Sequence, residues 1–160
     1  MLRPFDALAP QNSYDASVKS SACDPMAHFK SLSSETSHRP RILIVDDMPR
    51  VRQELCLLLP LTGELEVVGE AANGLEAISQ VERLHPDVVV LDLEMPVMDG
   101  YEAAHRIKSR WPACRVVVIS IHVGEAERQK AALAGADAFL VKGAPIEDLV
   151  KAIYETRGIN

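Results

Sequence analysis

The chain has 160 residues, 48% of them hydrophobic and only 4% aromatic, and its formal net charge is −6. This length favours one domain whose core is packed mainly by aliphatic side chains. The acidic balance argues against a general nucleic-acid or anionic-membrane binder, because both classes normally carry a basic patch.

Residues 1–40 hold eight serines and four prolines and show no sustained apolar period. Such a segment cannot bury enough surface to offset the entropy of ordering it. We therefore predict a mostly disordered extension over residues 1–39 and a folded domain over residues 40–160. Asp24 and Pro25 allow one short helix in the extension, and the extension could alternatively dock a partner.

Four apolar runs end directly on a polar side chain. Residues 42–45 end on Asp46 and Asp47, residues 88–91 on Asp92, residues 116–119 on Ser120, and residues 139–141 on Lys142. Short, β-branched and uniformly apolar runs are typical of strands buried on both faces. Residues 66–70 form a weaker pattern, which predicts a fifth strand nearer an edge of the sheet.

Helical patterns separate these strands. They begin near Pro49, after the caps Asn73 and Asp99, after His122 and at Pro145. In the first of them Val51, Leu55 and Leu58 share one face, and in the second Leu75, Ile78 and Val81 do so. Strand–helix alternation with short connections predicts an α/β fold, with a parallel sheet covered by helices on both faces.

The polar strand ends carry the chemistry. In open α/β sheets, ligands bind at the carboxyl ends of the strands, so one edge would present three carboxylates, a hydroxyl and an ammonium group. Carboxylates and phosphate oxygens are ligands that Mg²⁺ accepts. A carboxylate beside that ion can also attack phosphorus, and a lysine can neutralise the group being transferred.

In this order, the segments Val45-Asp46-Asp47, Leu91 to Gly100, Val118-Ile119-Ser120 and Phe139 to Lys142 resemble the receiver domain of bacterial two-component response regulators. The resemblance covers about residues 41–157, and its most specific part is Asp-x-x-Met-Pro-x-Met-Asp-Gly. The amino-acid sequence of these segments is most similar to receivers of the NarL/LuxR type. The resemblance implies a flavodoxin-like (βα)5 fold, doubly wound, with five parallel strands in the order 2-1-3-4-5.

The resemblance also implies roles for the site residues. Asp92 would be the phosphoacceptor, and Mg²⁺ would be held by Asp46, Asp47, Asp92 and the backbone carbonyl of Glu94. Lys142 would pair with Asp92 and then with the phosphoryl group. Ser120 and Phe139 would form the two-state switch.

Four positions depart from the commonest pattern of this family. Ser120 stands where threonine is frequent, Phe139 where tyrosine is frequent, and Gly143 where a proline often follows the lysine. Ile121 is bulkier than the usual small residue and could narrow access to Asp92. The side chains of Glu94 and His122 lie where they could tune the lifetime of a phosphoryl group, with solvated rim residues as the alternative.

The expected function is phosphoryl acceptance from a sensor histidine kinase or a histidine phosphotransfer protein, followed by a change in binding to a downstream protein that the sequence does not identify. A homodimer is compatible with this role. Because the sequence stops soon after the last predicted helix, we expect a stand-alone regulator, without a helix-turn-helix or direct DNA binding.

Two alternatives remain at this stage. One is a phosphate sink or relay without an output of its own, and the other is a Mg²⁺-dependent phosphohydrolase that forms an aspartyl phosphate. We expect no conventional enzyme, only catalysis of the chain's own phosphorylation and dephosphorylation. The three cysteines lack paired spacing and no signal or membrane span is evident, so we expect a cytoplasmic location.

Overall fold

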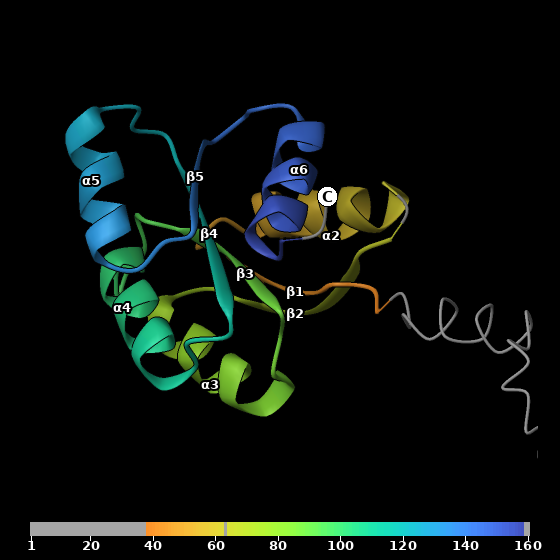
Figure 1. Ribbon diagram of the computed structural model, residues 1–160, viewed down its shortest axis with the longest axis horizontal. Coiled ribbons are helices and arrows are strands. Elements are labelled where there is room, and N and C mark those ends of the chain that lie inside the picture. Colours follow the sequence, from red (N-terminus) through yellow and green to blue (C-terminus); the bar gives the residue numbers. More distant parts are fainter. Residues whose placement is uncertain (1–37, 63, 159–160) are drawn as a thin grey trace, which may run out of the picture. The chain divides into compact units, whose positions relative to one another are not determined.

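The computed structural model describes residues 38–62 and 64–158. The predicted short helix near residue 25 and nearly all of the predicted disordered extension lie outside these residues. Strands and helices alternate along the described chain (Figure 1). The strands are β1 (Arg41–Val45), β2 (Glu66–Ala71), β3 (Val88–Asp92), β4 (Arg115–Ser120) and β5 (Ala138–Val141); the helices are α2 (Pro49–Leu61), α3 (Gly74–Leu84), α4 (Gly100–Arg110), α5 (Glu125–Leu133) and α6 (Ile146–Thr156).

The five strands form one parallel sheet in the order β2-β1-β3-β4-β5. This confirms the predicted flavodoxin-like fold and its strand order. The weaker apolar run is the edge strand β2, as its pattern predicted. The order brings the carboxyl ends of β1, β3, β4 and β5 next to one another, and these are the strands that end on polar side chains.

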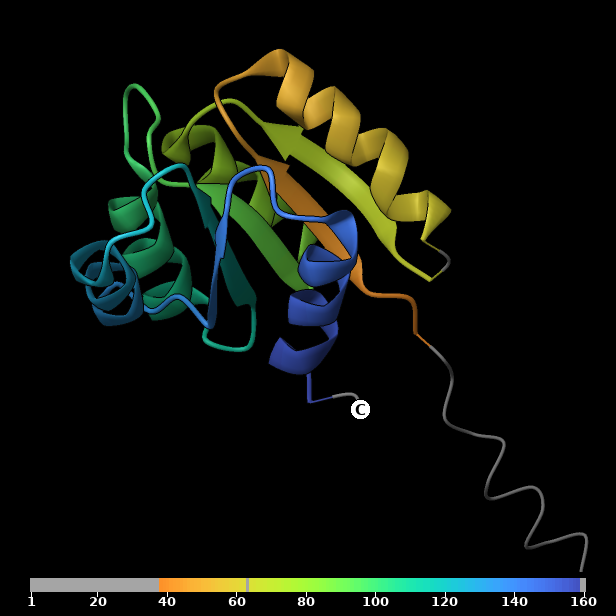
Figure 2. The ribbon, with the colours of Figure 1, turned by 90° about the horizontal axis from the view of Figure 1, so that it is seen from above.

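Helices cover both faces of the sheet, with α2 and α6 on one face and α3, α4 and α5 on the other (Figures 1 and 2). Each face has its own apolar core, because alternate strand residues point to opposite sides. Leu43, Val45 and Leu91 belong to the core under α3 and α4. Ile42 and Ile44 belong to the core under α2 and α6. The inner strands β1, β3 and β4 are therefore buried on both sides, which explains their nearly uniform apolar sequence.

Helix α2 differs from its predicted apolar face. Leu59 is its fully buried residue, whereas Leu58 is 37% exposed. Leu58 and Leu55 line a hollow of about 430 Å³ between α2, the end of β5 and the start of α6. The helix also continues one residue past Pro60. A similar difference occurs in α3, where Leu75 is 54% exposed although Ile78 and Val81 are buried.

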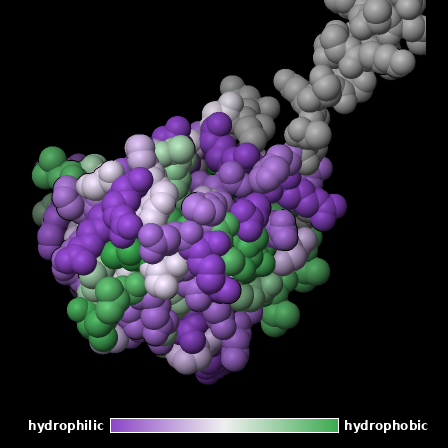
Figure 3. Space-filling view, turned by 90° about the horizontal axis from the view of Figure 1, so that it is seen from below, coloured by the Kyte–Doolittle hydropathy of each residue, from purple (hydrophilic) through white to green (hydrophobic). Residues whose placement is uncertain are grey.

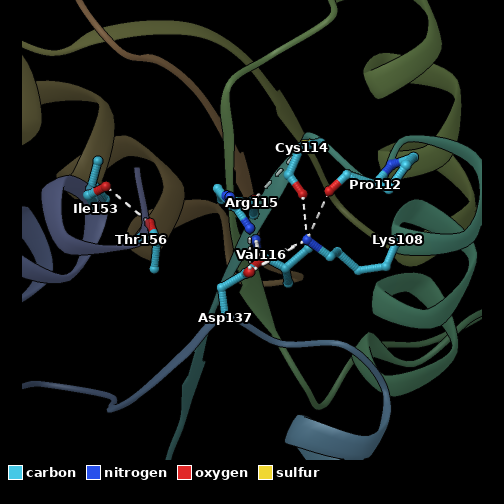
Figure 4. A network of polar contacts seen from close by, with 8 residues as sticks. All are labelled: Lys108, Pro112, Cys114, Arg115, Val116, Asp137, Ile153 and Thr156. Carbon is cyan, nitrogen blue, oxygen red and sulfur yellow. Dashed lines mark hydrogen bonds and ion pairs between the residues drawn. The ribbon is translucent and has the colours of Figure 1, made fainter. Parts of the chain in front are cut away.

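The amino ends of β4 and β5 are joined by a polar network centred on Asp137 (Figure 4). The Asp137 carboxylate accepts hydrogen bonds from Lys108 Nζ at 3.0 Å, from Arg115 Nη1 at 3.1 Å and from the Val116 backbone N–H at 2.8 Å. Lys108 also donates to the carbonyl of Cys114. The network connects α4 to both strands on the side of the sheet away from their polar carboxyl ends.

Replacing Asp137 by alanine is expected to lower the free energy of unfolding by about 2 kcal/mol, because three donors lose a charged acceptor. Urea denaturation measures this loss. Glu54→Ala, at an exposed position of α2, should change stability by less than about 0.5 kcal/mol. Equal stability of the two variants would contradict a structural role for the network.

On the face shown in Figure 3, the apolar side chains form separate patches with hydrophilic side chains between them. Within the described ranges, no helix has the length and the apolar character needed to span a bilayer.

Candidate phosphoryl-acceptor and metal site

Three carboxylates converge at the carboxyl edge of the sheet. Asp46 follows β1, and Asp92 ends the neighbouring strand β3; the pairing of Val45 with Leu91 sets the two side by side. One oxygen each from Asp46, Asp47 and Asp92 lies within 4.8 Å of the others. Asp46 is 0% exposed and Asp92 is 3% exposed, whereas Asp47 is exposed. The edge therefore concentrates negative charge with one open side.

Lys142 lies against this cluster from the end of β5. Its Nζ is 2.8 Å from Asp46 Oδ2 and 3.1 Å from Asp92 Oδ2. The contact with Asp92 has hydrogen-bond geometry, while Asp46 Oδ2 is buried without a well-directed donor. That oxygen therefore meets Lys142 as an ion pair. One lysine thus leaves the site short of positive charge, and this donor set fits a hard cation such as Mg²⁺.

Burial and charge act in opposite directions on this ion pair. Burial raises the pKa of Asp92, partly offset by Lys142, and the negative charge of Asp46 adds to the rise. Burial alone would lower the pKa of Lys142, but the two carboxylates outweigh it and the pKa is raised. Lys142 is therefore held as a cation, while the ionised form of Asp92 is only partly compensated.

Ser120 ends β4 and is fully buried. Its Oγ accepts a hydrogen bond from the His122 backbone N–H at 3.1 Å, which leaves its proton available to an acceptor. Phe139, in β5, pairs in register with Val118 and packs against the core under α4. The Arg128 guanidinium of α5 lies 4.9 Å from the centre of its ring. The two predicted switch residues thus lie on adjacent strands.

The loop after β3 approaches the cluster closely. The backbone N–H of Glu94 faces the Asp92 carboxylate and acts to lower its pKa, against the effect of burial. Val97 in this loop has a φ of 71°, a left-handed conformation that is strained for a β-branched residue. Gly100 follows, and its N–H donates to the Leu93 carbonyl at 3.0 Å. These contacts keep the loop folded back over the end of β3.

A comparison of the sequence with protein-family models gives a match to one family. The model described as "Response regulator receiver domain" matches residues 42–154. The chain belongs to this family of receiver domains. The match begins at the second residue of β1 and ends within α6.

Relatives of this receiver include NarL, the nitrate/nitrite response regulator protein of Escherichia coli, which is 38% identical over 114 residues. VraR, a response regulator protein of Staphylococcus aureus, is 35% identical over 116 residues. These alignments cover 71% and 72% of this chain but 53% and 56% of the relatives. The chain thus spans about half the length of the curated relatives that it matches.

Solved structures give the same result. The signal receiver domain of a putative response regulator NarL from Mycobacterium tuberculosis has a TM-score of 0.72 and 35% identity, and the match covers 76% of this chain and 98% of that one. A CheX–CheY–BeF3–Mg complex from Borrelia burgdorferi contains a chain with a TM-score of 0.67 and 26% identity, covering 72% and 87%.

Two contacts of this receiver have no clear signal in the sequence. His122 Nε2 lies 2.6 Å from Glu94 Oε1, and both side chains are about half exposed. This pair connects the loops after β3 and β4 at the rim of the site. The sequence placed both residues near the site, but their mutual contact depends on the side-chain conformations. The Arg128–Phe139 contact is similarly absent from any local pattern.

Two further departures from the family's commonest residues are Gly143 and Ile121. Gly143, where a proline is frequent, has a φ of 88°, and the described residues contain no cis peptide bond. Ile121 is 60% exposed at the rim beside Ser120. The direction of the Glu94 backbone carbonyl toward the carboxylates stays a prediction, as do the catalytic and metal-binding roles of the site residues.

Proposed function

We propose that this receiver accepts a phosphoryl group on Asp92 from the phosphohistidine of a sensor kinase or phosphotransfer protein, in a Mg²⁺-dependent reaction. The observation that carries the proposal is the convergence of Asp46, Asp47 and Asp92 around one point, with Lys142 bound to two of them.

In the proposed reaction an Asp92 carboxylate oxygen forms a bond to phosphorus, and the bond between phosphorus and the donor's imidazole nitrogen breaks. The imidazole leaves with the electron pair of that bond and takes up a proton. The Lys142 ammonium group, which pairs with Asp92 before the reaction, would pair with the phosphoryl oxygens after it. Such a transfer depends on positioning and charge neutralisation, which a preformed cluster supplies.

The metal ion would be held by Asp46, Asp47, Asp92 and the backbone carbonyl of Glu94. Bound Mg²⁺ supplies positive charge that offsets the carboxylates and the incoming phosphoryl oxygens. The Asp47 side chain is the exposed member of the set, so it would contribute its carboxylate from the solvent side of the site. The burial of the Asp46 carboxylate, with Lys142 as the one cation against its Oδ2 among the described residues, supports a role for Asp46 in the metal shell.

The Ser120 side chain would move toward the phosphoryl group and donate its hydroxyl proton to a phosphoryl oxygen. Phe139 would then fill the space that the serine side chain leaves. The switch would alter the surface of β5 and α5, because Phe139 contacts Arg128 there. A downstream protein or a second copy of the chain would bind the altered surface. A cytoplasmic location fits the two free cysteines, Cys56 and Cys114, of the described region.

The test is phosphotransfer with and without the metal. Incubation with a phosphorylated histidine donor and Mg²⁺ should add one phosphoryl group per chain, and EDTA should prevent it. Intact-mass measurement counts the groups, and reduction of the acyl phosphate followed by peptide mapping locates them. Modification that persists in EDTA or maps elsewhere than Asp92 would contradict the proposal. Continuous hydrolysis of simple phosphate esters would favour the phosphohydrolase.

A further inference from the structure

Arg52 contacts the main chain of the segment that carries Asp46 and Asp47. It lies in the first turns of α2, and its side chain is 15% exposed. Its Nη1 donates a hydrogen bond to the Asp46 backbone carbonyl at 2.7 Å. A charged donor to a carbonyl at this distance is one of the stronger hydrogen bonds in proteins.

The Asp46 main chain is thereby held on both sides. Its N–H donates to the Ala71 carbonyl at 3.1 Å, and its carbonyl accepts from Arg52. Asp46 Oδ1 also accepts from the Met48 N–H at 2.8 Å. Because the peptide unit is planar, fixing the Asp46 carbonyl fixes the direction in which the chain enters Asp47.

Glu70 holds Arg52 from the edge of the sheet. Its Oε2 lies 3.4 Å from Arg52 Nε, and Glu70 is in the edge strand β2. The Nε group is buried without a well-directed acceptor, and the Glu70 side chain is 52% exposed. This ion pair therefore orients the guanidinium less firmly than the bond to Asp46 does.

We propose that Arg52 is a positioning residue for the metal site, acting through the Asp46–Asp47 peptide. The inference rests on the proposed function, since it assumes that these aspartates bind Mg²⁺. A positioning role and a purely electrostatic role for Arg52 predict opposite changes in Mg²⁺ affinity when the arginine is replaced. Removing a nearby positive charge should tighten Mg²⁺ binding by Coulomb's law, whereas losing the brace on Asp46 should weaken it.

The experiment measures the Mg²⁺ dissociation constant of the full chain from the Mg²⁺-dependent increase in its free energy of unfolding. Arg52→Met is expected to weaken binding about tenfold, as loss of a group that orients a metal ligand typically does. Arg50→Met is the matched control, because Arg50 is an exposed arginine two residues earlier on α2; it should leave the constant unchanged.

Two further variants keep the test informative if Arg52→Met folds poorly. Arg52→Lys retains the charge but loses the planar fork, so binding should still weaken. Glu70→Gln should weaken it less than Arg52→Met does. Mg²⁺ binding by Arg52→Lys that equals or exceeds the wild type would overturn the inference while leaving the proposed function intact. A wild type that binds no Mg²⁺ would instead overturn the proposed function, and the inference with it.

Discussion

Replacing Asp92 by asparagine is expected to abolish phosphoryl acceptance while the protein stays folded. The amide has nearly the same shape as the carboxyl group, so it fits a site where Asp92 is 3% exposed. It lacks the anionic oxygen that would attack phosphorus. Intact-mass measurement after incubation with a phosphohistidine donor and Mg²⁺ gives the result. Asp148→Asn, at an exposed position of α6, should be modified like the wild type.

The same substitution has an expected effect on stability. Burial, together with the negative charge of Asp46, raises the pKa of Asp92 despite the opposing effect of Lys142, so the folded state binds this proton more tightly than the unfolded chain does. Stability therefore falls as pH rises through the raised pKa of Asp92. Asparagine carries no such charge.

Without Mg²⁺ at neutral pH, Asp92→Asn should thus unfold at higher urea concentration than the wild type. The difference should shrink as pH falls through the raised pKa toward the usual range of an aspartate. A variant less stable than the wild type at neutral pH would mean that pairing with Lys142 outweighs burial. Labelling that persists in the variant would reveal another acceptor.

Much of the fold was predictable because the sequence separates its strands so clearly. A run such as residues 88–91 is apolar at every position and rich in β-branched residues, which is typical of a strand buried on both faces. Each such run ends on a polar residue, and parallel strands bring those ends to one edge. The convergence of Asp46, Asp92 and Lys142 therefore follows from the topology, before any side-chain conformation is known.

Details that depend on helix rotation and side-chain conformation were not predictable in the same way. Leu57, Leu58 and Leu59 are consecutive leucines, so the apolar pattern does not specify which one enters the core; Leu59 does. The bond from Arg52 to the Asp46 carbonyl joins a side chain to a main-chain group, and main-chain acceptors exist at every position. Such contacts leave no pattern that sequence spacing can identify.

Gly100 shows why one residue of the most specific motif is a glycine. A Cβ atom built on Gly100 would lie 2.1 Å from the Asp92 carbonyl oxygen and 2.7 Å from the Leu93 Cα. Both are main-chain atoms at the end of β3, so neither can rotate away as a side chain could. The loop can fold back over the strand that carries Asp92 only if residue 100 has no side chain.

Gly100→Ala is therefore expected to lower the free energy of unfolding by about 3 kcal/mol and to weaken Mg²⁺ binding, because relieving the overlap shifts the main chain of Asp92. Gly143→Ala is the matched control. Gly143 has a φ of 88° but no atom within 4 Å of its Cβ position, so its cost is the left-handed backbone alone, about 1 kcal/mol. Urea denaturation separates the two costs. Equal losses would show that the close approach at Gly100 relaxes freely, and Asp92 would then not depend on the loop for its placement.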